Sequence, residues 1–354
     1  MSNALLITLL VAAAAVRADQ PVTFAPGPAD SPESSASMDS PPLEEVVVSG
    51  AFPGPGMWKV TRADDSGGHV LWIVGDAPPL PKRMQWKSSE VEAVVLTAQQ
   101  ILRDSAINMA PDEEIGIFRG LTLLPAILKA RKNPDDGKLK DLLPPDLYAR
   151  WLVQKHEYLG RESGADEWRP IFAAYKLRKA AIDDLKLREK DMVWDVVGKL
   201  AARNKIPVDS PLLKFTIKRN ELRAKIKEFS RESLSDVECF TATLQLTEAL
   251  SDRETEGARA RAWATGDLQT LDALPVLPTP GLPCAMAVMS SQVAREVIPG
   301  DIREQLYRLW TDAAEKSLAT NQTTFAIVPL AKLTREQGYL ARLRAKGYLV
   351  EPPR

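Results

Sequence analysis

The stretch LWIVGDAPPLP, residues 71–81, places an acid where a buried strand is expected to end. Residues 71–74 are apolar, Gly75 and Asp76 end the run, and three prolines follow within five positions. Chemistry often takes place at such junctions, because a rigid strand holds side chains at the mouth of a sheet. The carboxylate of Asp76 can act there as a general acid or base, or as one half of an ion pair.

The usual markers of metal and cofactor sites are missing from the sequence. It has two histidines, His69 and His156, and no His-x-x-His, Cys-x-x-Cys or spaced carboxylate motif. Neither a G-x-S-x-G elbow, a Walker loop nor a G-x-G-x-x-G turn follows a strand. We therefore expect no conventional zinc site and no cofactor.

Two further clusters carry charge that could bind an anion. Arg259 and Arg261 stand near Trp263, where they could clamp a carboxylate or phosphate. The commoner arrangement is arginines stacked on aromatic rings or paired with acids such as Asp267. Residues 199–227 hold nine Lys and Arg against two acids, which suits an anionic lipid or acidic polysaccharide.

The favoured alternative for this basic segment is a solvated helix face, because Leu222, Ile226 and Phe229 keep helical spacing beneath it. The whole chain has a formal net charge of −1. From residue 57 onward 45 basic residues face 41 acidic ones, an excess of four. That excess is too small to indicate nucleic acid as a partner.

The N-terminus has the pattern of an export signal. Residues 4–16 are apolar and Val16-Arg17-Ala18 offers small residues at both recognition positions, so we expect cleavage after Ala18 and a periplasmic protein. Since residues 1–3 contain no Lys or Arg, an uncleaved anchor is the rival interpretation. Residues 19–56 hold eight Pro, six Ser and four Gly, which predicts a disordered acidic linker. No later window is apolar enough to predict a transmembrane span in the mature chain.

The elements that must position these residues form a mixed α/β fold, with strands at both ends of residues 57–354 and helices between. A hairpin is expected around the turn DDSGG, and helices over residues 88–106, over most of the middle of the chain, over about 233–265 and over about 300–320. Residues 323–331 and 348–353 read as strands that flank a short helix. The central sheet is therefore assembled from N- and C-terminal strands whose ends face one cleft.

Four segments together resemble the TraB/GumN family in order along residues 57–351. The segments are GMWKV with HVLWIVGDAPPLP, WDVVGKLAARNKIPV, RARAWATGDL, and the closing TTFAIVPLAKLTREQGYLARLRAKGYLVE. The resemblance implies metal-dependent peptide cleavage. In the family, a G-x-x-H motif after each of two strands and a Glu after a third would hold a divalent metal that activates water.

The sequence departs from the family at each of these positions. Pro78 stands where the first His belongs and Lys332 where the second belongs, while the Glu position falls near Arg103 or Asp104. Proline has no side-chain donor atom, and a Lys ammonium has no lone pair for a metal at neutral pH. The metal chemistry that the resemblance implies is therefore not expected to transfer, and no metal-ligating residues are assigned.

Three interpretations of function remain open. The first is a pseudoenzyme or binding protein that keeps the family cleft for a peptide or small ligand. The second is a hydrolase with a rebuilt site, in which Asp76 and Lys332 face each other as an acid/base or ion pair. The third is an envelope interaction protein that uses its linker and basic segment on an anionic envelope component.

The two cysteines, Cys239 and Cys284, bear on the compartment. In an oxidising compartment two cysteines of one domain often pair, but the sequence by itself fits two separate buried thiols equally well. Exported proteins that this chain resembles have a Cys at both places, which implies a disulfide. Its Cα atoms should then lie within about 7 Å of each other.

Overall fold

The computed structural model describes residues 54–62, 68–112, 117–160, 164–278, 281–298 and 300–353. The predicted signal sequence, and the predicted linker up to residue 53, lie outside these residues. The hairpin turn expected around residues 64–68 lies almost wholly outside them as well.

The central sheet confirms that the first hairpin and the closing strands pair with one another. Its six strands run in the order β10, β1, β2, β9, β4, β7, with β10–β1–β2 antiparallel and β2–β9–β4–β7 parallel. The bounds are β1 Met57–Arg62, β2 Val70–Asp76, β4 Gln100–Arg103, β7 Val208–Asp209, β9 Thr323–Pro329 and β10 Tyr348–Glu351. The predicted mixed α/β class is confirmed.

Helices cover both faces of this sheet, and the pleat decides which strand residues meet which layer. Leu71 and Ile73 of β2 face α14, α15 and α16, while Trp72 and Val74 face α2, α7 and α10. The first layer comprises α14 Ile302–Thr320, α15 Leu330–Thr334 and α16 Tyr339–Ala345. The second comprises α2 Ser89–Thr97, α7 Met192–Asn204, α10 Arg253–Ala264 and α11 Leu268–Ala273.

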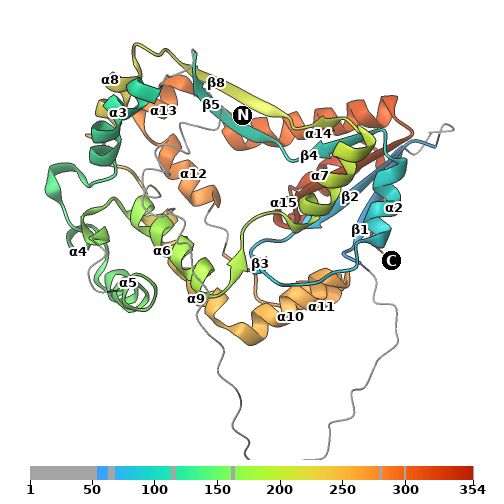
Figure 1. Ribbon diagram of the computed structural model, residues 1–354, viewed down its shortest axis with the longest axis horizontal. Coiled ribbons are helices and arrows are strands. Elements are labelled where there is room, and N and C mark those ends of the chain that lie inside the picture. Colours follow the sequence, from blue (N-terminus) through green and yellow to red (C-terminus); the bar gives the residue numbers. More distant parts are fainter. Residues whose placement is uncertain are drawn as a thin grey trace, which may run out of the picture.

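A second group of helices has its own apolar core, separate from the two cores on the sheet, and includes the buried rings of Trp151 and Phe240. In Figure 1 it lies on the left, away from β1, β2 and β4. Its helices are α3 Ile117–Ala130, α4 Leu139–Leu142, α5 Pro145–Tyr158, α6 Pro170–Asp184, α8 Leu222–Phe229, α9 Val237–Ser251, α12 Gly281–Met289 and α13 Gln292–Val297, with short 3₁₀ turns η1 Pro134–Asp136 and η2 Ala165–Glu167.

Two strand pairs outside the main sheet link these parts of the chain. The parallel strands β5 Ala106–Pro111 and β8 Leu212–Ile217 run from the sheet toward α3 and α8, as Figure 1 shows. The antiparallel pair β3 Leu80–Pro81 and β6 Leu187–Arg188 joins the segment after β2 to the segment after α6. None of the described helices has the length and apolar character needed to cross a membrane.

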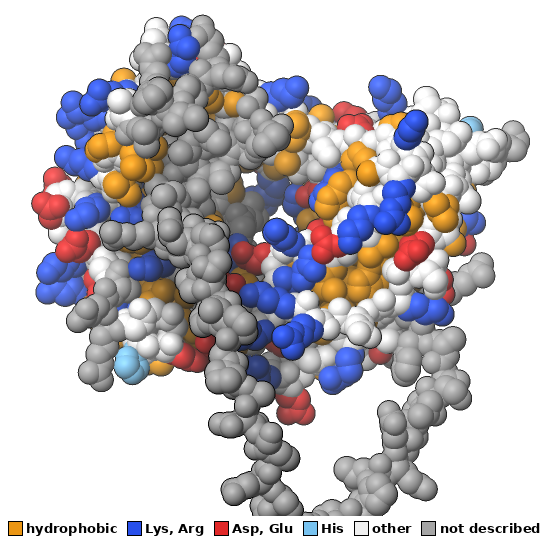
Figure 2. Space-filling view, in the orientation of Figure 1, with side chains coloured by type: hydrophobic (Ala, Val, Ile, Leu, Met, Phe, Trp, Pro, Cys, Tyr) orange, Lys and Arg blue, Asp and Glu red, His pale blue; other side chains and the backbone are white. Residues whose placement is uncertain are grey.

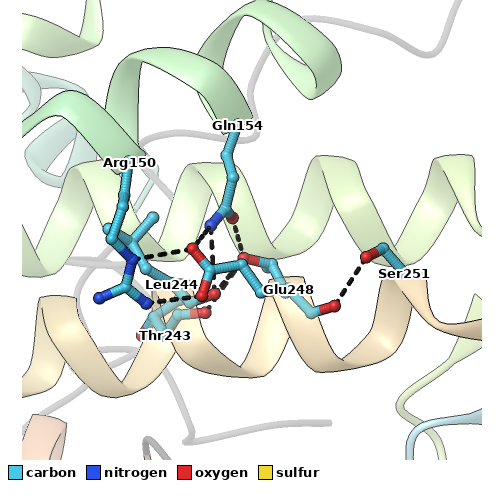
Figure 3. Close-up of polar contacts among 7 residues, drawn as sticks. Arg150, Gln154, Thr243, Leu244, Glu248 and Ser251 are labelled. Atoms are coloured by element: carbon cyan, nitrogen blue, oxygen red, sulfur yellow. Dashed lines mark hydrogen bonds and ion pairs between the residues drawn. The ribbon is translucent and has the colours of Figure 1, made fainter. Parts of the chain in front are cut away.

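Polar contacts fix α5 against α9, as Figure 3 shows. Arg150 of α5 binds both carboxylate oxygens of Glu248 on α9, at 3.0 and 2.5 Å. Gln154, one turn further along α5, donates to Glu248 at 2.8 Å and to the carbonyl of Leu244 at 3.2 Å. A bidentate Arg–carboxylate pair constrains both distance and angle, so these contacts set the register of α9, the helix that carries Cys239.

Two sequence-based helix predictions are wrong in their extent. The helix expected over residues 88–106 ends at Thr97, and residues 100–103 form β4 instead. Ile101 and Leu102 are both fully buried, because β4 lies between β9 and β7 with helices on both faces. The helix expected over residues 233–265 is divided at Asp252, which caps α10.

The disulfide between Cys239 and Cys284 is present, which confirms the prediction from the resemblance. The Cα atoms lie 4.5 Å apart, within the expected 7 Å. The bridge ties α12 to α9 across 45 residues of chain. These residues include α10, which packs on the sheet.

Removing this bridge should lower the free energy of unfolding by about 4 kcal/mol, because cross-linking a loop of 45 residues restricts the unfolded chain. The measurement is urea unfolding of C239S/C284S against the oxidised wild type. Reduced wild type serves as the control and should unfold at the midpoint of the double variant. A double variant as stable as the oxidised protein would contradict this expectation.

Candidate functional site

The carboxyl ends of β2, β9 and β4 lie side by side at one edge of the sheet. In the parallel register Asp76 pairs with Pro329, and Arg103 pairs with Ile327 two residues earlier on β9. The positions where the family pattern would place metal ligands follow these three strand ends. Register alone thus brings them to one edge.

Glycine at position 75 allows α15 to pack directly on the end of β2. A Cβ built on Gly75 would lie 2.6 Å from Cδ1 of Leu330 and 3.2 Å from its Cα. Gly338 is just as constrained, because its Cβ would lie 2.4 Å from the carbonyl oxygen of Lys332. The turn from α15 to α16 is therefore tight, which brings Lys332 and Tyr339 close together.

Lys332 and Tyr339 both bind Asp104, the residue that follows β4. Lys332 Nζ lies 2.6 Å from Oδ2 of Asp104, and the Tyr339 hydroxyl donates to Oδ1 at 2.6 Å. Burial, followed by the negative charge of Asp104, raises the pKa of Tyr339. Tyr339 therefore stays a donor at all physiological pH values. We call Asp104, Lys332 and Tyr339 the lysine cluster.

Asp76 lies in a second polar group, with Asp191, Arg103 and Arg188. The Asp76 side chain is buried, and its Oδ1 atom has no hydrogen-bond partner in the described part of the chain. Burial, followed by repulsion from Asp191, raises the pKa of Asp76 to about 7. The amide of Ala77 and the positive charges of Arg188 and Arg103 oppose that rise.

Asp191 is held in this group by the start of α7. Its Oδ1 caps the helix by accepting the Trp194 amide at 2.8 Å, and its Oδ2 lies 3.3 Å from Arg103. The Arg103 guanidinium also stacks over the Trp194 ring at 4.1 Å. Burial raises the pKa of Asp191 as well. We call Asp76, Asp191 and Arg103 the aspartate cluster.

Among the described residues Lys332 pairs with Asp104 and no ion pair joins it to Asp76, so the two side chains do not face each other; a catalytic role for either residue stays a prediction. Side chains alternate along β2, so Asp76 points to the same face of the sheet as Trp72 and Val74, the face that α7 covers. Lys332 binds Asp104 on the opposite face, which α14 and α16 cover. The sheet edge therefore separates the two side chains. Arg103 and Asp104, the two candidates for the family Glu position, divide between the two clusters in the same way.

A cavity of about 420 Å³ opens beside the lysine cluster. Its wall is largely apolar and includes Ile107, Leu306 and Pro329, with the rings of Tyr307 and Tyr339. Three cations also line the cavity, namely Lys332, Arg303 and Arg335. An apolar cavity of this size with a few charged groups at its wall is typical of a site for a small organic ligand.

Arg259, Arg261 and Trp263 do not form the anion clamp that their spacing suggested. Arg259 is buried, with Nε 3.1 Å from Glu256 and its terminal nitrogen 2.6 Å from the carbonyl of Pro275. Arg261 is exposed. Trp263 donates from Nε1 to the carbonyl of Gly75 at 2.7 Å, so its role is to hold the end of β2.

Sequence reasoning missed Asp191, Tyr339 as a site residue, and Arg188. Asp191 had a usable signal, because an acid directly before the apolar helix pattern MVWDVVGKL is a typical N-cap. Tyr339 stands in the Gly-Tyr-Leu stretch of the closing segment. Its bond to Asp104 joins residues 235 positions apart, which no local pattern reveals.

The donor set does not fit the divalent metal that the family pattern implies. Pro78 supplies no ligand, Lys332 is a cation, and Asp104 already binds Lys332 and Tyr339. Within the described ranges no group of three His, Cys, Asp or Glu side chains could hold a metal ion. We therefore derive no step through a metal.

Comparison with known proteins supplies one match. The family model described as TraB/PrgY/gumN family matches residues 56–352. No curated protein and no solved structure matches the chain.

The raised pKa of Asp76 should appear as a pH-dependent cost in stability. A raised pKa in the folded state favours the protonated carboxyl there, and this contribution is lost as pH rises from about 4 toward 7. Relative to wild type, D76N should thus gain about 3 kcal/mol in free energy of unfolding between pH 5 and pH 8. Urea unfolding at both pH values measures this change.

The control is D252N, at an exposed aspartate that caps α10. Hydrogen bonds from Thr255 lower the pKa of Asp252, so its contribution is lost only below pH 4. Its effect on stability should therefore be the same at pH 5 and pH 8. If the difference in free energy of unfolding between D76N and wild type is the same at pH 5 and pH 8, the pKa of Asp76 is not raised.

Proposed function

The chain belongs to the TraB/PrgY/gumN family, and from that premise we propose that it is an exported, metal-independent binding protein. It takes a peptide or small ligand into the cavity beside the lysine cluster. In this proposal Lys332, at the position of a family histidine, provides a positive charge for ligand binding. The family cleft is then a binding site without metal chemistry.

The observation that carries the proposal is the position of Lys332 at the cavity wall. Its ammonium is fixed by Asp104 at 2.6 Å while its side chain still lines the cavity. Asp104 neutralises one positive charge, and Arg303 contributes another at the same wall. An apolar ligand body with one carboxylate, such as the C-terminus of a short peptide, complements this arrangement.

A second candidate function is hydrolysis, and one observation favours it. Asp76, which is buried at the end of β2, and Asp191, which is half-buried at the start of α7, both have raised pKa values, a condition that suits general acid/base catalysis. Asp76 does not line the cavity beside Lys332, however. This separation supports binding over hydrolysis as the function of that cavity.

The test uses tri-leucine and tri-phenylalanine peptides, N-acetylated so that only the C-terminal carboxylate is charged. Calorimetry should show binding of the acids and at least tenfold weaker binding of the matching amides. K332M should weaken binding of the acids by tenfold or more, which is about 1.4 kcal/mol. The control K199M removes an exposed lysine of α7 and should leave binding unchanged.

Two results would overturn the proposal. Equal affinity for acids and amides would remove the role of the cations. Release of amino acids from the peptides, abolished in D76N, would favour the hydrolase instead, and metal analysis of the same preparation would show whether the turnover needs a metal.

The proposed export predicts a defined N-terminus. Support comes from the apolar stretch at residues 4–16 and from the disulfide, which suits an oxidising compartment. Protein from the periplasmic fraction of a Gram-negative host should begin at Asp19 by N-terminal sequencing. L9R, which interrupts the apolar stretch, should abolish export. An intact Met1 in the membrane fraction would support the anchor instead.

A further inference from the structure

A second cavity lies far from the sheet edge, between the end of α3 and α8. Its volume is about 1,210 Å³, and none of its lining residues belongs to the lysine or aspartate cluster. Figure 2 shows Lys and Arg side chains gathered over α3 and α8 at the upper left. Six cations line the cavity, namely Lys129, Arg131, Lys132, Arg223, Lys227 and Arg231.

Most of this positive charge is not balanced by the protein. Lys132 pairs with Glu167 at 2.8 Å, whereas the other five cations form no ion pair in the described part of the chain. Asp135 and Asp136 also line the cavity. Six cations against these two acids and Glu167 leave an excess of three positive charges. By contrast Lys225, also on α8, pairs with Glu228 and Glu296.

The cations on α8 point away from the protein core because of the helix period. Leu222, Ile226 and Phe229 are buried in the helical core, which turns Arg223 and Lys227 outward to the cavity. Arg223 and Lys227 are one turn apart, so their like charges repel and cost a few tenths of a kcal/mol. An anion bound between the two side chains would attract both of them and offset this repulsion.

The opposite wall is held in place by stacking and hydrogen bonds. The Arg131 guanidinium lies over the Trp168 ring at 3.7 Å, and its Nε is buried without a hydrogen-bond partner. The following loop is fixed by Asn133, which donates to the carbonyl of Trp168 at 2.9 Å, and by Arg169, which donates to the carbonyl of Lys132 at 3.1 Å. The Arg131 guanidinium and the loop after α3 are therefore held in position before any ligand arrives.

We propose that this cavity binds a small ligand that carries several phosphate groups. The volume is too large for a single phosphate, and an excess of three charges matches a ligand with three or more negative charges. Three of the unpaired cations are arginines, whose planar fork binds phosphate oxygens in pairs. The site is independent of the function proposed for the cavity beside Lys332, since the two share no residue.

Inorganic tripolyphosphate is the probe, with calorimetry of the full exported chain as the measurement. Wild type should bind it, and R223Q/K227Q should bind it at least tenfold more weakly. The matched control is K199Q/R203Q, which removes two exposed charges at the same i,i+4 spacing from α7. The control should bind tripolyphosphate as wild type does. Thermal unfolding of each variant checks that the fold is retained.

A second variant on the opposite wall makes the test independent of α8. R131Q should also weaken binding by tenfold or more, because Arg131, which directly follows α3, lines the cavity. Citrate, a trivalent carboxylate, should bind much more weakly than tripolyphosphate. Equal binding of citrate would overturn the assignment to phosphate. Equal losses in K199Q/R203Q and R223Q/K227Q would show attraction by overall charge and overturn the site.

Discussion

The parallel pairing of β2 with β9 is the constraint on which the rest of the molecule depends. It joins residues 70–76 to residues 323–329, so the chain between them, which also supplies β4 and β7 to the sheet, must return to lie beside β2. Both strands are buried by helices on both faces, which makes this pair the centre of the sheet. Their shared register also aligns the two strand ends, and with them Asp76 and the start of α15.

The same pairing explains why one strand end carries two separate polar groups. Neighbouring residues on a strand point to opposite faces, so Arg103 and Asp104 reach opposite helix layers from adjacent positions. Asp76 shares a layer with Arg103, and Lys332 shares one with Asp104. At this edge of the sheet, the lysine that is in contact with an acid is Lys332, and the acid is Asp104.

The sequence predicts the parts of this fold that have strong local patterns. The first hairpin strands, the closing strand after residue 322 and the helix near residues 302–320 all follow clear apolar periodicity. β4 does not, because four residues with one apolar pair look the same in a buried strand as in a helix. Its identity depends on partners more than 100 residues away, which a local pattern does not contain.

The sequence predicted where the candidate site lies, but it did not predict which acid Lys332 binds. The resemblance brought residues 76 and 332 to one edge, yet the first turn of α15 decides toward which strand the lysine points. That turn is set by the close approach of Leu330 to Gly75 and of Gly338 to the Lys332 carbonyl. Backbone packing of this kind is a tertiary property, so motif spacing alone gave the wrong partner.

Direct contacts hold the three strand ends where the family pattern would place metal ligands. Trp263 binds the Gly75 carbonyl at the end of β2, and Asp104 after β4 binds both Lys332 of α15 and Tyr339 of α16. Each contact is charged or buried, and hydrogen bonds of that kind contribute more to stability than exposed neutral ones. The arrangement thus keeps the three strand ends in fixed positions beside the cavity that Lys332 and Tyr339 line.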